Sequence, residues 1–227
     1  EISSGLVGSE MCIRDSSQTG FTGEKGYEIY VRDAHENAEK MWNAVLEAGE
    51  EFGLMVIAPA HHRRIAAGIL SWGQDLDHET SPFQVNLAYQ VPRNKAADYI
   101  GKEALEKQRA IIDEGNAPFK MKMVGITFGG KEITDYAPDF WLIEDTDGNE
   151  MGYVTSPWWS PELETNIGLA WVPWSSSEVG TKLQVKLPEE YSDGGPAQGE
   201  VVEVPFRESV NPNKREVQKA KGLDYAD

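Results

Sequence analysis

The spacing of apolar and polar positions changes character near residue 117. Before that point the apolar positions mostly recur at helical intervals, and after it they alternate in short segments. Helices are predicted from Asp33, with Glu36 completing a capping box, from Pro59 to about Leu70, and from Gly101 to near Gly115. Alternation predicts strands at 27–31 and 83–91.

The segments after residue 118 are short and are separated by turn residues. Strands are predicted at 121–128, 140–144, 152–155, 167–172, 182–187 and 201–206. Short strands with regular turns are typical of a small antiparallel β-barrel. The chain is therefore predicted to be of the α+β class, with an α+β domain over 17–117, a β-barrel over 118–209 and a polar tail over 210–227.

Composition narrows the functional classes. Among 227 residues, 21 Lys and Arg face 38 Asp and Glu, which gives a net charge of −17. This acidity argues against nucleic acid or an anionic membrane as the main partner. No apolar stretch approaches the roughly 20 residues of a membrane span, and one Cys excludes a disulfide framework. We expect a cytoplasmic protein.

The first sixteen residues, EISSGLVGSEMCIRDS, resemble a translated sequencing adapter. EMCIRDS back-translates into the transposon end that such adapters carry. We therefore expect no helix or strand within 1–16 and assign Cys12 to this segment; a natural, irregular N-terminus is the alternative. The natural protein is then expected to continue upstream.

Metal-binding patterns are weak in this sequence. His61 and His62 are adjacent and would point about 100° apart on a helix, so they do not chelate together. The alternating acidic residues at 75–79 lack the glycine and terminal glutamate of a calcium loop, and 145–149 is predicted to be a hairpin turn. We predict no metal site, and the glycine-rich nucleotide loops and serine-hydrolase motifs are absent.

One constellation suggests a binding pocket. Glu28 and Tyr30 share a strand face beside a glycine-rich turn that carries Phe21, and Arg64 precedes small residues and then Trp72. A carboxylate with aromatic and small residues suits a flat heterocycle with N–H donors, and an arginine suits its carboxylate tail. Plainer interpretations are a solvated Glu28, a surface cation at Arg64 and a core Trp72.

Four ordered segments resemble the glycine-cleavage T-protein family. They are GFTGEKGYEIYV at 20–31, RIAAGILSWGQDLDHETSPFQVNLAYQV at 64–91, IGKEAL at 100–105 and GYVTSPWWSPELETNIGLAWVP at 152–173. The resemblance implies the C-terminal part of the T-protein-type folate-binding fold followed by the family's barrel. It also implies tetrahydrofolate as cofactor, with a methyl or aminomethyl group moved onto or from it.

The resemblance also implies roles for individual residues. Glu28 matches the glutamate that binds the pterin, Arg64 matches the arginine near the folate tail, and Phe21 and Trp72 stand where aromatic residues line the pocket. Tyr30 is added because it shares a strand face with Glu28. The family aspartate near the folate nitrogen is expected upstream, so the catalytic residue is unknown. The chain by itself is expected to be inactive and prone to aggregation.

Departures from the T-protein pattern bear on the substrate. Ala66 stands where the pattern has Glu, Trp72 replaces a Tyr, and Gln84 and Asn86 break the pattern after Pro82. The residues of these motifs resemble the demethylase branch of the family more closely. We therefore expect a folate-dependent methyltransferase most like dimethylsulfoniopropionate demethylase. The alternatives are a glycine-cleavage aminomethyltransferase, with a lipoyl carrier protein as partner, or a non-enzymatic folate-binding protein.

Overall fold

The computed structural model describes residues 14–17 by their backbone, and 19–58, 61–93 and 95–206 with their side chains. It forms two compact units, Glu1–Ala60 and His61–Asp227, called unit one and unit two below. Each unit is described by itself. The predicted polar tail lies outside the described residues, and the predicted domain bounds at 17, 118 and 209 stay predictions.

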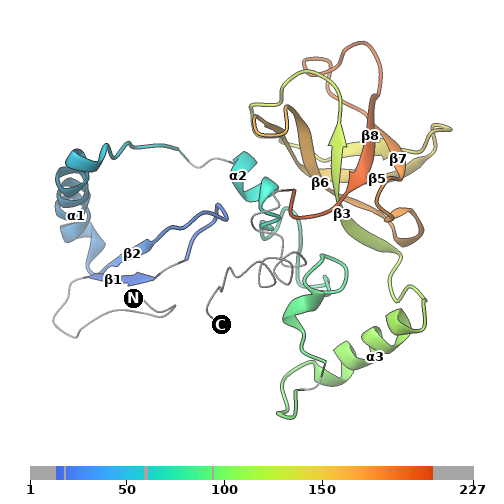
Figure 1. Cartoon of the computed structure of the whole chain (residues 1–227), viewed down its shortest axis with the longest axis horizontal. Coiled ribbons are helices and arrows are strands. Elements are labelled where there is room, and N and C mark those ends of the chain that lie inside the picture. The colour runs from blue at the N-terminus through green and yellow to red at the C-terminus, as the bar shows by residue number, and fades with distance from the viewer. Residues whose placement is uncertain (1–13, 18, 59–60, 94, 207–227) are drawn as a thin grey trace, which may run out of the picture. The chain divides into compact units, whose positions relative to one another are not determined.

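Unit one combines a two-stranded antiparallel sheet with a helix (Figure 1). β1, Arg14–Ser17, pairs with β2, Glu28–Val31, so that Arg14 lies opposite Val31 and Ser17 opposite Glu28. α1 covers Ala34–Gly49, and the 3₁₀ helix η1 covers Glu50–Phe52. The β2 prediction is confirmed.

Two expectations for unit one are wrong. Residues 14–16 were expected to form no strand, but they pair with β2, because a strand's backbone donors and acceptors need partners whatever side chains the neighbouring segment carries. The capping box at Asp33 is also absent. Asp33 has φ 48°, its side chain makes no cap, and its carbonyl oxygen accepts the N–H groups of Glu36 and Asn37 at 2.9 and 3.1 Å.

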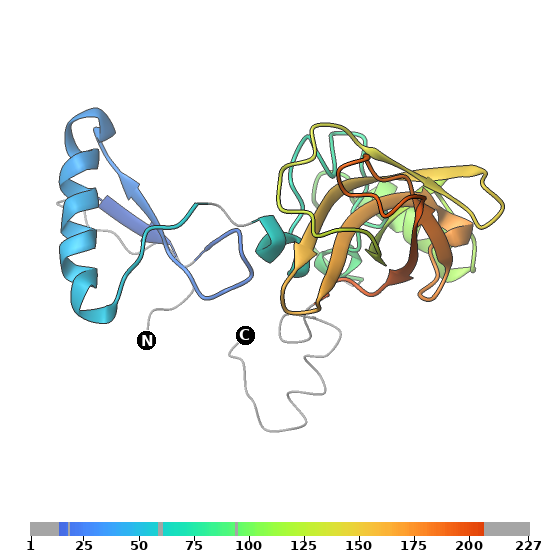
Figure 2. The same cartoon turned by 90° about the horizontal axis from the view of Figure 1, so that it is seen from above.

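Unit two begins with α2, His61–Ala66, followed by the 3₁₀ helix η2, Ala88–Gln90, and by α3, Lys102–Asp113. Six strands then form a closed antiparallel barrel in the order β3-β6-β5-β4-β7-β8 (Figures 1 and 2). Their bounds are β3 Met121–Phe128, β4 Trp141–Glu144, β5 Glu150–Ser160, β6 Thr165–Pro173, β7 Lys182–Val185 and β8 Ala197–Val202, with the 3₁₀ helix η3, Trp174–Ser176, after β6. The predicted α+β class with a small barrel is confirmed.

Strand alternation gives the barrel two cores. On β3, Val124, Ile126 and Phe128 point into the barrel, while Met123 points outward. The outward set, with Ile167, Leu169 and Trp171 of β6, packs on Ile65 and Ala66 of α2 and on Val85. β6 is buried on both faces for this reason, and its sequence is a nearly continuous apolar run.

Two element predictions in unit two are wrong. α2 ends at Ala66 rather than near Leu70, because Gly68 adopts φ 71° and the N–H groups of Gly68 and Ile69 return to the carbonyls of Ile65 and Arg64. Residues 83–91 form turns and η2 rather than a strand. Gln84 and Asn86 there hydrogen-bond the backbone of β3, so the segment covers the barrel without joining a sheet.

Among the described residues, no helix is long and apolar enough to cross a membrane. The cytoplasmic location stays a prediction.

Candidate functional site

Glu28 sits on β2 in a small cluster of hydroxyl groups. Its Oε2 accepts a hydrogen bond from Thr19 Oγ1 at 2.7 Å and another from Tyr30 Oη at 2.6 Å. The Thr19 bond, then the Tyr30 bond, lowers the pKa of Glu28 below its ordinary value, and the same contact raises the pKa of Tyr30. Glu28 is therefore ionised at neutral pH, and the predicted shared face of Glu28 and Tyr30 is confirmed.

The aromatic residues predicted near Glu28 are accessible. Phe21 is 50% exposed and Tyr30 is 52% exposed, and Glu28 itself is exposed. Glu28 is thus more than a solvated strand residue, because two hydroxyl groups fix its carboxylate while leaving it open to a ligand.

Arg64 is buried in unit two, so the interpretation as a surface cation is wrong. Arg64 is 1% exposed, and its Nη1 lies 2.8 Å from Asp75 Oδ2. Nη1 also donates to the carbonyl of Ile69 at 3.1 Å, and Nη2 donates to Ser156 Oγ at 2.7 Å. Arg64 therefore joins α2, the loop after it and strand β5.

Asp75 is the centre of this network, although the sequence pattern presented it only as part of a weak calcium-loop motif. Its carboxylate accepts hydrogen bonds from Thr155 Oγ1 at 2.5 Å, Ser156 Oγ at 2.6 Å and the N–H of Ser71 at 2.8 Å. Its carbonyl accepts the indole N–H of Trp171 at 3.0 Å. We call Arg64, Asp75, Thr155 and Ser156 the buried network. Asp75, Thr155 and Ser156 lie within the family-like segments GQDLD and YVTSP, where the sequence analysis predicted no binding role for them.

His61 lies beside the buried network and contacts two aromatic rings. Its ring stacks on Trp158 at 5.3 Å and meets the edge of Tyr136 at 5.0 Å, and its Nδ1 accepts from Arg64 Nε at 3.4 Å. Burial, and then the charge of Arg64, lower the pKa of His61. The described residues contain no group of three or more His, Cys, Asp or Glu side chains that could hold a metal ion.

Trp72 is 60% exposed, so its interpretation as core is also wrong. Its ring meets His78 edge-on at 4.7 Å. Trp72 stands in the loop that Asp75 anchors, directly after Ser71, whose N–H is bound by the Asp75 carboxylate. An exposed indole on an anchored loop is a surface that a ligand ring can stack on.

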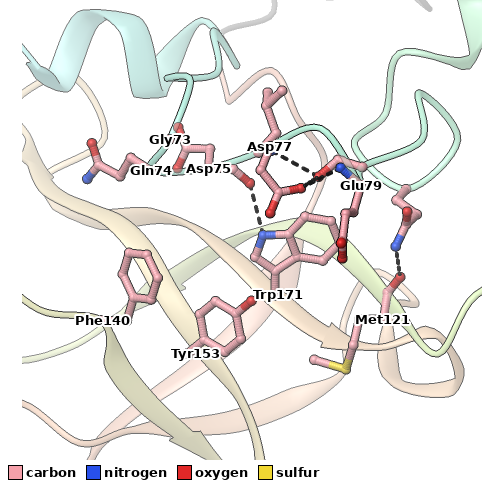
Figure 3. A pocket seen from close by; sticks show the side chains of 12 residues that line it. Gly73, Gln74, Asp75, Asp77, Glu79, Met121, Phe140, Tyr153 and Trp171 are labelled. Carbon is pink, nitrogen blue, oxygen red and sulfur yellow. Dashed lines mark hydrogen bonds between the residues drawn. The ribbon is translucent and has the colours of Figure 1, made fainter.

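The same loop borders a pocket of about 340 Å³ against the barrel (Figure 3), called the loop–barrel pocket below. It is lined by Gly73, Gln74, Asp75, Leu76, Asp77, Glu79, Thr80, Gln84, Met121, Phe140, Tyr153 and Trp171. None of the five residues predicted from the sequence to bind folate lines this pocket, and the two units divide those five residues between them. Glu28, Tyr30 and Phe21 belong to unit one, and Arg64 and Trp72 belong to unit two.

Comparison with known proteins places these features in a family. The GCVT N-terminal domain matches residues 11–95, and the glycine cleavage T-protein C-terminal barrel domain matches residues 121–207. Together the two domains cover more than half of the chain. The chain belongs to the glycine cleavage T-protein family, as the resemblance predicted. The N-terminal match begins within the adapter-like segment.

Among its relatives, an aminomethyltransferase of Geobacillus sp. (strain WCH70) is 36% identical over 173 residues, covering 75% of this chain and 44% of the relative. One of Clostridium botulinum (strain Okra / Type B1) is 35% identical over 184 residues, covering 80% and 46%. The chain thus spans less than half the length of these relatives.

A crystal structure of glycine cleavage system aminomethyltransferase T from Bartonella henselae has the same fold. Its TM-score is 0.68 at 23% identity, with 86% of this chain and 50% of that chain covered. The relatives named here are aminomethyltransferases, and none of them is named a demethylase. The glycine-cleavage alternative is therefore better supported than the demethylase expectation.

Proposed function

We propose that the protein containing this chain is an aminomethyltransferase that moves a one-carbon unit onto tetrahydrofolate, and that this chain supplies part of the folate site. The observation that carries the proposal is the hydroxyl-bound carboxylate of Glu28. It lies in the family-like segment 20–31, within the GCVT N-terminal match.

Glu28 suits a pterin for chemical reasons. A pterin ring presents N–H donors along one edge, and an ionised carboxylate accepts from such donors strongly. Thr19 and Tyr30 hold the carboxylate in one orientation, so less side-chain freedom is lost when a ligand binds. The exposed ring of Phe21 offers a stacking surface in the same unit.

For Arg64 we propose an indirect part in folate binding. Asp75 already neutralises the Arg64 guanidinium at 2.8 Å, which weakens any attraction of Arg64 for an anionic folate tail. Its main contribution is then to fix the loop that carries Trp72. Bound tetrahydrofolate would supply the nitrogen that accepts the one-carbon unit. The residues of this chain orient the folate, and holding two reactants in the right geometry speeds the transfer between them.

We propose an aminomethyl group as the transferred unit and a lipoyl carrier protein as the partner that brings it. A methyl donor of the demethylase type is the second candidate, because Ala66 and Trp72 depart from the T-protein pattern. Ala66 is 5% exposed and packs in the outer barrel core, where the glutamate of that pattern would be buried among apolar side chains.

The folate proposal is tested by titrating tetrahydrofolate into the chain and its Glu28→Gln variant. Glutamine keeps the size but loses the charge, so we expect affinity to fall about ten- to a hundredfold. Glu39→Gln, an exposed change on α1 in the same unit, is the matched control. Equal affinity of the Glu28→Gln variant and the unchanged chain would refute the assignment.

The donor is tested in a protein that contains this chain together with the remaining half found in its relatives. Aminomethyl-loaded lipoyl carrier protein and dimethylsulfoniopropionate are supplied in parallel with tetrahydrofolate, and the folate product is identified by mass. We expect product from the carrier protein. Product from the sulfonium compound alone would favour the methyl donor, and folate binding without any transfer would favour a non-enzymatic protein.

A further inference from the structure

Three aromatic side chains, those of Phe140, Tyr153 and Trp171, form part of the wall of the loop–barrel pocket. Phe140 and Tyr153 stack at 5.3 Å with an interplanar angle of 13°, and Tyr153 lies directly opposite Trp171 in the pairing of β5 with β6. Residues opposite each other in an antiparallel pair share a sheet face. The indole N–H of Trp171 donates its hydrogen bond to the carbonyl of Asp75, so the ring presents only an apolar surface to the pocket.

The charged groups of the loop–barrel pocket are all acidic. Asp75, Asp77 and Glu79 contribute carboxylates, and none of the described lining residues is Lys, Arg or His. Arg64 compensates Asp75, which leaves Asp77 and Glu79 to set the sign of the local charge. In Figure 3, Asp77 and Glu79 lie on one side of Trp171, whereas Phe140 and Tyr153 lie on its other side. Burial, and then the charge of Asp77, raise the pKa of Tyr153 above its ordinary value.

These features select the chemistry of a ligand. Aromatic faces attract cations through their quadrupole, and the two carboxylates add to the attraction. An anion such as a folate tail would be repelled by the same carboxylates. A metal ion is a poor fit, because the described residues offer no set of three metal-ligating side chains.

The aromatic side chains favour an alkylated cation over a bare ammonium group, because aromatic faces recognise quaternary ammonium groups. Asp77 Oδ1 already accepts from the N–H of Glu79 at 2.9 Å and from Thr80 Oγ1 at 3.0 Å. A primary ammonium would need further acceptors for its three N–H groups, whereas a quaternary ammonium donates no hydrogen bond. The volume of about 340 Å³ lies at the small end of ligand pockets.

We propose that the loop–barrel pocket binds a small alkylated ammonium ion between the Phe140–Tyr153 aromatic pair and the carboxylates of Asp77 and Glu79. All the residues that line this site belong to unit two, and its occupant carries the opposite charge to folate. Because the pocket is open to solvent on the side of Phe140, which is 53% exposed, we expect a dissociation constant of about 1 mM.

The test titrates choline into the chain and follows backbone and indole N–H signals by NMR, with sodium chloride at equal ionic strength as the blank. The neutral isostere 3,3-dimethylbutan-1-ol has the same shape as choline without its charge. We expect saturable shifts at Tyr153 and Trp171 with choline, and affinity at least threefold weaker for the isostere. Equal affinities, or no saturable shift, would overturn the proposal.

Two pairs of variants locate the site. Phe140→Leu and Asp77→Asn are each expected to weaken choline binding about three- to thirtyfold. Phe119→Leu and Asp147→Asn are the matched controls, since both lie outside the pocket lining. Circular dichroism checks that each variant is folded. If the control variants weakened choline binding as much as the pocket variants, the proposal would also be overturned.

Discussion

Glu28 in unit one and Asp75 in unit two are both carboxylates that accept hydrogen bonds from two hydroxyl groups. Thr19 and Tyr30 serve Glu28 at 2.7 and 2.6 Å, and Thr155 and Ser156 serve Asp75 at 2.5 and 2.6 Å. Glu28 is exposed, whereas Asp75 is 1% exposed and is further paired with Arg64. Nearly the same local chemistry therefore occurs in two different environments.

The difference in burial separates the two roles. A buried carboxylate must have its charge matched within the protein, so Asp75 is committed to holding its loop on the barrel. An exposed carboxylate keeps accessible oxygen atoms. The hydroxyl neighbours therefore orient Glu28 and leave it able to accept hydrogen bonds from a ligand. Residue type and bonding partners alone do not distinguish a structural carboxylate from one that can bind a ligand.

The largest effect is expected from Asp75→Ala. It leaves the charge of Arg64 buried without its carboxylate, which we expect to lower the free energy of unfolding by about 3–5 kcal/mol. Urea unfolding followed by tryptophan fluorescence measures this, since every tryptophan except Trp42 lies in unit two. Asp113→Ala, which breaks the exposed pair with Arg93, is the control and should change stability far less. Similar losses from both variants would contradict the comparison.

A smaller loss is expected from Thr155→Val, which removes one hydroxyl from the buried network and keeps the side-chain shape. The buried Asp75 oxygen loses a donor at 2.5 Å, and we expect a cost of about 1–3 kcal/mol in the same unfolding experiment. Thr19→Val makes the same change beside the exposed Glu28. If it proved as destabilising as Thr155→Val, burial would not be the deciding difference.

The stability of unit two should also fall as the pH is lowered from 7 to 5. The pKa of His61 is below its ordinary value in the folded chain, chiefly because of burial, so the unfolded chain takes up the proton first. Stability is then full above the ordinary histidine pKa of about 6.5 and is lost as pH falls towards the folded pKa. The urea midpoint measured against pH should fall less steeply for His61→Phe, and parallel profiles would contradict this.

The smallest expected effects concern the pKa of Glu28. Thr19→Val should raise it towards the ordinary glutamate value, and Tyr30→Phe should raise it less, because the Thr19 bond is the larger cause of the lowered pKa. Carboxyl-carbon NMR titration measures both shifts. An unchanged pKa in Thr19→Val would show that the hydroxyl groups do not hold the carboxylate.

Some of the site could be predicted from the sequence, and some could not. The alternation of β2 was enough to place Glu28 and Tyr30 on one face, because the spacing of side chains along a strand is local. The pairing of Arg64 with Asp75, and of Asp75 with Thr155, joins residues 11 and 80 positions apart, and no local pattern reports such contacts. The same limit explains the missed end of α2, where the conformation of Gly68 decided against a longer helix.

By itself, the sequence determined the α+β class, the small barrel and the family, because alternation, turn residues and ordered motifs act over a few neighbouring positions. Only the tertiary structure decided that Arg64 and Asp75 are buried while Trp72 is exposed. It also decided that residues 83–91 cover the barrel without forming a strand, and that a pocket with acidic and aromatic walls lies beside the loop. Burial and charge pairing depend on which distant segments meet, and that is settled when the barrel closes and its outer face is covered.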